Sequence, residues 1–117
     1  MARAAGELNR EWAKTSVRAH AIEEYYTAAD KDFAQYLKGK GFAAEEIGTH
    51  AGLADTSLAL AVAPSLVRID QLKAASRGKA EGVYGNPARA SAELGRAGLD
   101  LIVERTVAAI RKATARQ

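Results

Sequence analysis

The sequence predicts an α/β domain with a mostly parallel sheet, and two observations lead to this fold class. Residues 16–22 alternate apolar and polar side chains, which is typical of a short strand with one buried face. Helical patterns flank this segment, and the strongest of them follows Pro87. Because strands that alternate with helices usually form layered α/β proteins, we expect a sheet covered by helices.

The first half of the chain predicts two helices around this strand. Residues 2–13 form the first helix, with Leu8 and Trp12 on one face. Residues 28–40 form the second, an amphipathic helix that ends at a pair of glycines. Trp12 is interpreted as a core anchor rather than as part of a substrate cage.

The middle of the chain predicts shorter elements. Residues 43–47 favour a turn of helix, and residues 46–50 favour a possible second strand. Residues 55–63 predict a mostly buried helix that Asp55, Thr56 or Ser57 caps at its N-terminus. The polar, glycine-rich residues 71–85 indicate a loop.

The last helix has the clearest signals. Asn86 and Pro87 supply a cap and a first-turn proline, and apolar residues then recur at helical spacing as far as Ala113. Gly95 and Gly98 each cost about 1 kcal/mol relative to alanine inside a helix, so we expect close packing to offset them.

Composition indicates one globular domain, residues 1–117. The absence of cysteine fits a reducing compartment, and no apolar run is long enough for a membrane span or an export signal, so we expect a cytoplasmic protein. The net charge of +3 is spread among interleaved acids and bases, which disfavours nucleic-acid binding.

A histidine between glycines is the main candidate for chemistry. His50 lies in the segment Gly48-Thr49-His50-Ala51-Gly52, and Asp55 follows it after five residues. An imidazole in such a turn transfers protons near neutral pH, which makes His50 a candidate general acid or base. The alternatives are an ordinary loop histidine and an aspartate that caps a helix. Tyr84 and Gly85 either line a substrate pocket or form a turn before the last helix.

Several blocks of this sequence resemble the creatininase (creatinine amidohydrolase) family. The blocks keep the family's order over about residues 7–113, and they are LNREW at 8–12, THAGLADTSL at 49–58, PSLVR at 64–68 and GVYGNP at 82–87. The resemblance corresponds to the C-terminal half of the family domain. It implies part of a three-layer α/β/α fold, helix-rich in this portion.

The resemblance implies a metal-dependent hydrolase of non-peptide C–N bonds in small amides, commonly a homo-oligomer. Two divalent ions, zinc or manganese, would activate a water in the complete family domain. His50 matches the family's catalytic histidine, which carries a proton to the leaving nitrogen. Asp55 matches an acidic position, usually glutamate, near that histidine and the substrate.

The family's metal ligands come from an N-terminal half that would precede Met1. We therefore expect no metal ligand in this chain; His20 and the paired acids Glu23, Glu24, Glu45 and Glu46 lack the converging arrangement that a binuclear site requires.

Three hypotheses follow for the protein as a whole. It is a truncated or split hydrolase completed by another polypeptide, an inactive remnant that pairs with a partner, or a small interaction or nucleic-acid-binding protein. We expect a small amide substrate if the site is complete, an oligomer or a missing half as partner, and neither nucleic acid nor a membrane.

Overall fold

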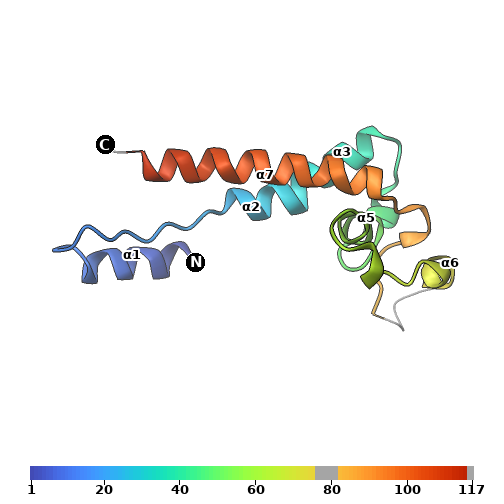
Figure 1. Ribbon diagram of the computed structural model, residues 1–117, viewed down its shortest axis with the longest axis horizontal. Coiled ribbons are helices and arrows are strands. Elements are labelled where there is room, and N and C mark those ends of the chain that lie inside the picture. Colours follow the sequence, from blue (N-terminus) through green and yellow to red (C-terminus); the bar gives the residue numbers. More distant parts are fainter. Residues whose placement is uncertain (76–81, 116–117) are drawn as a thin grey trace.

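The computed structural model describes residues 1–75 and 82–115, which fold into helices joined by loops (Figure 1). The α-helices are α1 (Ala2–Glu11), α2 (Glu24–Thr27), α3 (Phe33–Gly39), α4 (Ala44–Ile47), α5 (Leu53–Val62), α6 (Leu72–Ala75) and α7 (Ala92–Thr114). A π-helical turn, η1 (Ala28–Asp32), joins α2 to α3, and short 3-10 turns are η2 (Pro64–Leu66), η3 (Ile69–Gln71) and η5 (Pro87–Arg89).

The predicted α/β fold is wrong for the described residues, which contain helices and no named strand. Residues 16–22 are outside any helix, but no backbone of a neighbouring strand pairs with them. Instead, the Asn9 side chain donates to the Ala19 carbonyl at 2.9 Å and accepts from the Ala19 N–H at 2.8 Å. A β-strand requires a series of backbone hydrogen bonds to a neighbouring strand, whereas the Asn9 side chain bonds to one residue only.

The possible second strand at 46–50 is also wrong. Its first residues belong to α4, and only an isolated antiparallel bridge joins His50 to Tyr84. The helical turn predicted at 43–47 is confirmed as α4.

Two predicted helix starts are shifted in the structure. The helix α5 begins at Leu53, with Gly52 as its N-cap, instead of at a cap supplied by Asp55 or its neighbours. Asn86 caps the short turn η5, whereas α7 starts later, with the Ser91 side chain accepting from the Leu94 N–H. The turn η5 and the helix α7 thus have separate caps.

The remaining predicted helices are present in the structure, with different boundaries. The helix α1 and the second helix are both present, although the second begins at Glu24 and includes the π-helical turn. Within the loop predicted at 71–85, residues 72–75 form α6, and residues 76–81 lie outside the described residues.

The core lies where α3, α4 and α5 meet the first half of α7. It is formed by Phe33, Leu37, Ile47 and Leu53, of which three are fully buried. We call this part of the molecule, residues 33–75 and 82–102, the head. It carries every residue of the candidate site described below.

The contact between α5 and α7 is the most extensive between helices in the described chain; Gly95 makes it possible, and Gly98 lets α7 pack equally closely against α3. A methyl group at Gly95 would overlap the Ser57 carbonyl and lie 2.8 Å from the Ala61 Cβ. At Gly98 it would lie 2.7 Å from ring carbons of Phe33. The close packing predicted for these glycines is confirmed.

The molecule is elongated, with extents of 56 × 27 × 26 Å and a radius of gyration of 17.7 Å. A compact chain of this length has a radius of gyration of about 13 Å. The difference comes from the long helix α7, whose second half extends away from the head, and from an arm, which we define as residues 1–22: α1 buries no residue and lies at the far end from the head (Figure 1).

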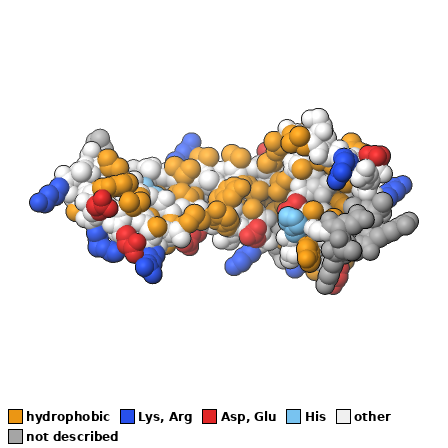
Figure 2. All heavy atoms as spheres, turned by 90° about the horizontal axis from the view of Figure 1, so that it is seen from below, with side chains coloured by type: hydrophobic (Ala, Val, Ile, Leu, Met, Phe, Trp, Pro, Cys, Tyr) orange, Lys and Arg blue, Asp and Glu red, His pale blue; other side chains and the backbone are white. Residues whose placement is uncertain are grey.

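Hydrophobic side chains gather along the middle of the face drawn in Figure 2, between the arm and the head. Exposed large hydrophobic residues of α2 and α7 are Tyr25, Tyr26, Val103, Val107 and Ile110. No helix in the described part of the chain combines the length and the apolar character needed to cross a membrane.

Candidate functional site

Two segments far apart in the sequence form the centre of the site. One is residues 48–52, the histidine loop, and the other is residues 82–86, the tyrosine turn. The His50 N–H donates to the Tyr84 carbonyl at 3.4 Å, and the Tyr84 N–H donates to the His50 carbonyl at 2.8 Å; this pair of bonds is the isolated antiparallel bridge. The Thr49 N–H also donates to the Tyr84 carbonyl, at 2.7 Å, so the two segments hold each other by their backbones.

Glycines allow this approach. A methyl group at Gly85 would lie 2.6 Å from the Gly52 Cα and 3.0 Å from the Gly48 Cα, closer than carbon atoms pack. Gly48 also has a φ of +70°, a left-handed conformation that side chains other than glycine seldom adopt. The glycines of both segments are therefore needed by the backbone contact itself.

The helix α4 anchors the tyrosine turn from the other side. The Asn86 N–H donates to the Glu46 carbonyl at 3.0 Å. The Glu46 side chain pairs with Arg89 at 3.1 Å, and the Arg89 guanidinium lies 4.3 Å from the centre of the Phe42 ring. Glu46 is therefore committed to structure, which removes one of the paired acids from the candidates for metal binding.

His50 and Tyr84 face each other across the bridge. Directly opposed residues of an antiparallel pair project their side chains to the same side, about 4.5–5.5 Å apart at Cβ. Both side chains are exposed, Tyr84 by 49%. The structure thus places the backbone of Tyr84 directly opposite that of the predicted proton-transfer residue.

Asp55 braces the histidine loop. Its Oδ2 accepts from the Ala51 N–H at 2.8 Å, and Ala51 holds a positive φ of 52°. In the described part of the chain, no hydrogen bond joins the Asp55 and His50 side chains. The neighbouring Thr56 hydroxyl donates to the Ala51 carbonyl at 3.3 Å. The backbone N–H and the carbonyl of Ala51 are therefore both bonded to side chains of α5.

Ser57 takes no part in capping α5. Its side chain is fully buried, and its Oγ accepts from the Ser91 N–H at 3.3 Å. It therefore joins α5 to the segment that starts α7.

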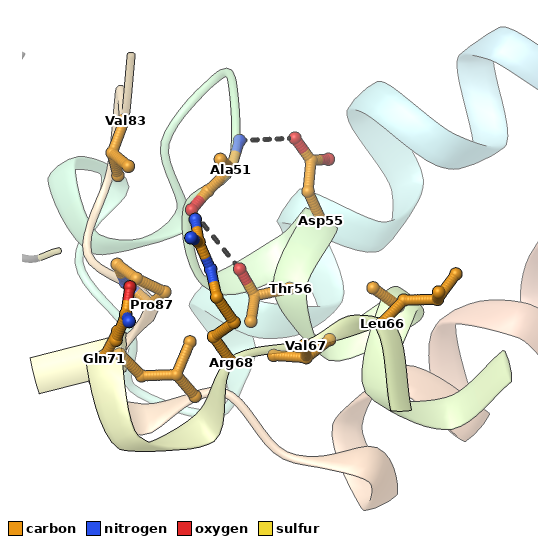
Figure 3. Close-up of a pocket in the computed structure, with 11 residues that line it drawn as sticks. Ala51, Asp55, Thr56, Leu66, Val67, Arg68, Gln71, Val83 and Pro87 are labelled. Atoms are coloured by element: carbon orange, nitrogen blue, oxygen red, sulfur yellow. Dashed lines mark hydrogen bonds between the residues drawn. The ribbon is translucent and has the colours of Figure 1, made fainter. Parts of the chain in front are cut away.

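A pocket of about 550 Å³ opens beside the histidine loop (Figure 3). Its described lining residues are Ala51, Asp55, Thr56, Ala59, Leu66, Val67, Arg68, Gln71, Leu72, Val83 and Pro87. His50 and Tyr84 are not among these residues, although their chain neighbours Ala51 and Val83 are. The pocket therefore adjoins the histidine loop and the tyrosine turn at the residues next to the bridge.

Sequence reasoning missed the pocket and Arg68. The arginine lies in the block PSLVR, which supports the resemblance without a role for any single residue. Nothing in its local pattern distinguishes it from other exposed arginines. Only the folded chain brings it into the pocket that Asp55 also lines.

The described residues do not fit a metal centre. Within 1–75 and 82–115, no group of three or more His, Asp or Glu side chains converges on one point. His20 is exposed in the arm, away from the head. A binuclear centre needs several converging ligands, so the donor set of this part of the chain does not hold one.

Comparison with known proteins gives one finding about identity. The model of the creatininase family, described as creatinine amidohydrolase, matches residues 1–110. The match starts at residue 1, so it does not support limiting the resemblance to the C-terminal half of the family domain. No curated protein and no solved structure matches the chain significantly. Since the matched region covers almost the entire chain, this protein belongs to the creatininase family.

Proposed function

We propose that this protein acts in the hydrolysis of non-peptide C–N bonds in small amides, with His50 as the proton-transfer residue. Membership of the creatininase family supports the reaction class. The bridge between His50 and Tyr84 supports the role of His50. The bridge and the glycine contacts beside it fix the histidine's backbone, while its side chain stays exposed.

The chemistry assigned to this chain is limited to proton transfer and positioning. A water oxygen adds to the amide carbon, the C–N bond breaks, and the proton lost by the water reaches the leaving nitrogen through His50. Such a transfer contributes about 100-fold to 10,000-fold to a rate. Asp55 positions the histidine loop through the Ala51 N–H, and Tyr84 holds the backbone of His50 through the bridge.

The family's divalent ions, zinc or manganese, would generate the attacking hydroxide. Because the described residues do not supply their ligands, we propose that these ligands come from another polypeptide, either a separate chain or a segment absent from these 117 residues. The protein is then a split or truncated hydrolase whose activity depends on that partner.

The test measures amide hydrolysis by the full chain with and without a polypeptide that carries the family's metal ligands, in the presence of Mn²⁺ or Zn²⁺. We expect hydrolysis only with the partner, and a loss of about 100-fold or more in His50→Ala. His20→Ala is the matched control, because it removes the chain's other histidine from an exposed place in the arm. A reconstituted pair that binds no metal, or a His50→Ala variant with full activity, contradicts the proposal.

A further inference from the structure

The pocket beside the histidine loop contains an arginine that has no ion-pair or hydrogen-bond partner for its guanidinium among the described residues. Arg68 lines the pocket and extends through it toward Ala51 (Figure 3). Ion pairs of the described residues join Arg3 to Glu7, Arg89 to Glu46 and Arg105 to Asp32, and none of them involves Arg68. Its guanidinium also makes no hydrogen bond within residues 1–75 and 82–115. A planar group with five donors is thus available to a ligand in the pocket.

We propose that this pocket binds the carboxylate of a small amide, with Arg68 as its recognition group. Guanidinium and carboxylate match each other in shape, and their paired hydrogen bonds are stronger than those between neutral groups. The apolar lining from Leu66, Val67 and Pro87 suits a short carbon chain between the charged end and the rest of the ligand.

Asp55 determines the rest of the ligand's chemistry. Its Oδ2 is engaged by the Ala51 N–H, and Oδ1 has no hydrogen bond within the described residues. A carboxylate oxygen only accepts, so the ligand presents an N–H donor to it. An N-acylated amino acid carries both groups, a carboxylate for Arg68 and an amide N–H for Asp55.

The charge of the pocket favours a carboxylate over a phosphate. Arg68 and Asp55 are the charged residues among its described lining, and their charges cancel. A single negative charge on the ligand pairs with Arg68, whereas the second charge of a phosphate would be repelled by Asp55. This assignment extends the proposed function, because it names the class of amide that the site would receive.

The test compares two probes of equal size in binding to the full chain, measured by calorimetry. N-acetylglycine carries the carboxylate and N-acetylglycinamide does not. We expect the wild type to bind N-acetylglycine about tenfold more tightly or better, since one charge-assisted contact supplies that factor. Arg68→Gln removes the preference, and Arg68→Lys keeps part of it. Arg111→Gln, an exposed arginine in the last turn of α7, leaves the preference unchanged.

Three outcomes would overturn the carboxylate site: equal affinity of the wild type for both probes, a preference that survives in Arg68→Gln, or tighter binding of inorganic phosphate than of N-acetylglycine. Circular dichroism of Arg68→Gln shows whether the variant is folded, and Arg68→Lys decides the question if it is not. Binding is measured without turnover. Arg68-dependent binding without hydrolysis therefore removes only the proposed function, and hydrolysis without a charge preference removes only this inference.

Discussion

At the scale of single residues, the geometry of the site depends on glycines more than on its reactive side chains. Gly48, Gly52 and Gly85 let two loops meet backbone to backbone, and His50 gains its fixed place from that contact. The chemically reactive groups need no direct contact with each other in this arrangement. Their positions depend on the absence of a Cβ atom at these glycines, which lets the two backbones approach.

Replacing Gly85 by alanine therefore destabilises the protein. The added methyl group would press on the Cα atoms of Gly52 and Gly48, which belong to the backbone and cannot rotate away. We expect a loss of about 1–3 kcal/mol in the free energy of unfolding, measured with urea. Gly39→Ala is the control, because a methyl group there meets no atom within 4 Å. Equal stability of the two variants would contradict this account of the loop contact.

The brace from Asp55 makes a separate prediction. Asp55→Ala leaves the Ala51 N–H without its acceptor and costs about 1 kcal/mol of stability. Asp55→Asn keeps an oxygen at the same place, so its stability stays close to that of the wild type. Thermal unfolding of both variants measures the difference, and an equal loss in the two would show that the carboxylate charge matters more than the hydrogen bond.

At the scale of elements, the pair α5 and α7 holds the two halves of the site in register. The Ser57 hydroxyl accepts from Ser91, and Gly95 brings the backbone of α7 onto α5. The histidine loop precedes α5 and the tyrosine turn precedes α7, so the contact between these helices sets the distance between the loops.

Gly95→Ala tests this role of the helix pair. Alanine is the better helix former by about 1 kcal/mol, yet its methyl group would collide with the Ser57 carbonyl. We expect a net loss of stability of about 1–3 kcal/mol, together with shifted NMR signals of His50. Ala108→Gly, at an exposed position of the same helix, should cost about 1 kcal/mol and leave the His50 signals in place. A stabilising Gly95→Ala substitution would refute the close contact.

Helical elements were predictable because their periodicity is local, whereas the sheet was not. Alternation in residues 16–22 describes which side chains share a face, but it carries no information about a pairing neighbour. The shift of the α5 cap has a similar origin. Asp55 lies in the first turn of α5, and its side chain accepts from the Ala51 N–H before the helix. From the sequence alone, an acid in the first turn looks the same as an acid at the N-cap.

The candidate site was predictable only in part. His50 and Asp55 stand out in their glycine-rich segment, and the block containing Tyr84 stands out beside a helix start. Their juxtaposition comes from a tertiary contact between residues distant in sequence, which no local pattern encodes. Arg68 was likewise not predictable, because only the folded structure places it in the pocket.

At the scale of the whole molecule, the site lies in the head, whereas the arm contributes nothing to the core. The four buried residues of the main cluster lie in the head, and α1 contributes none. The stability of the site is therefore independent of most contacts made by the arm.

Hydrogen exchange measures this division directly. Amides of α1 should exchange much faster than those of α5, because helices without buried contacts open at low cost in free energy. Mass spectrometry of peptides from the two helices supplies the comparison within one sample. Equal protection of α1 and α5 would mean that the arm is held by contacts with a second molecule or by a stronger association with the head.

The bridge between His50 and Tyr84 also has a consequence for folding kinetics. Ser57 and Ser91, which join the elements that follow these two segments, are 34 residues apart. Closing a loop of this length has an entropic cost that is met before the contact gives any stability, so nascent helices form first and the loops join late. The histidine then reaches its place in the last steps of folding, and a refolding experiment followed at His50 should report a slower phase than one followed by helix content.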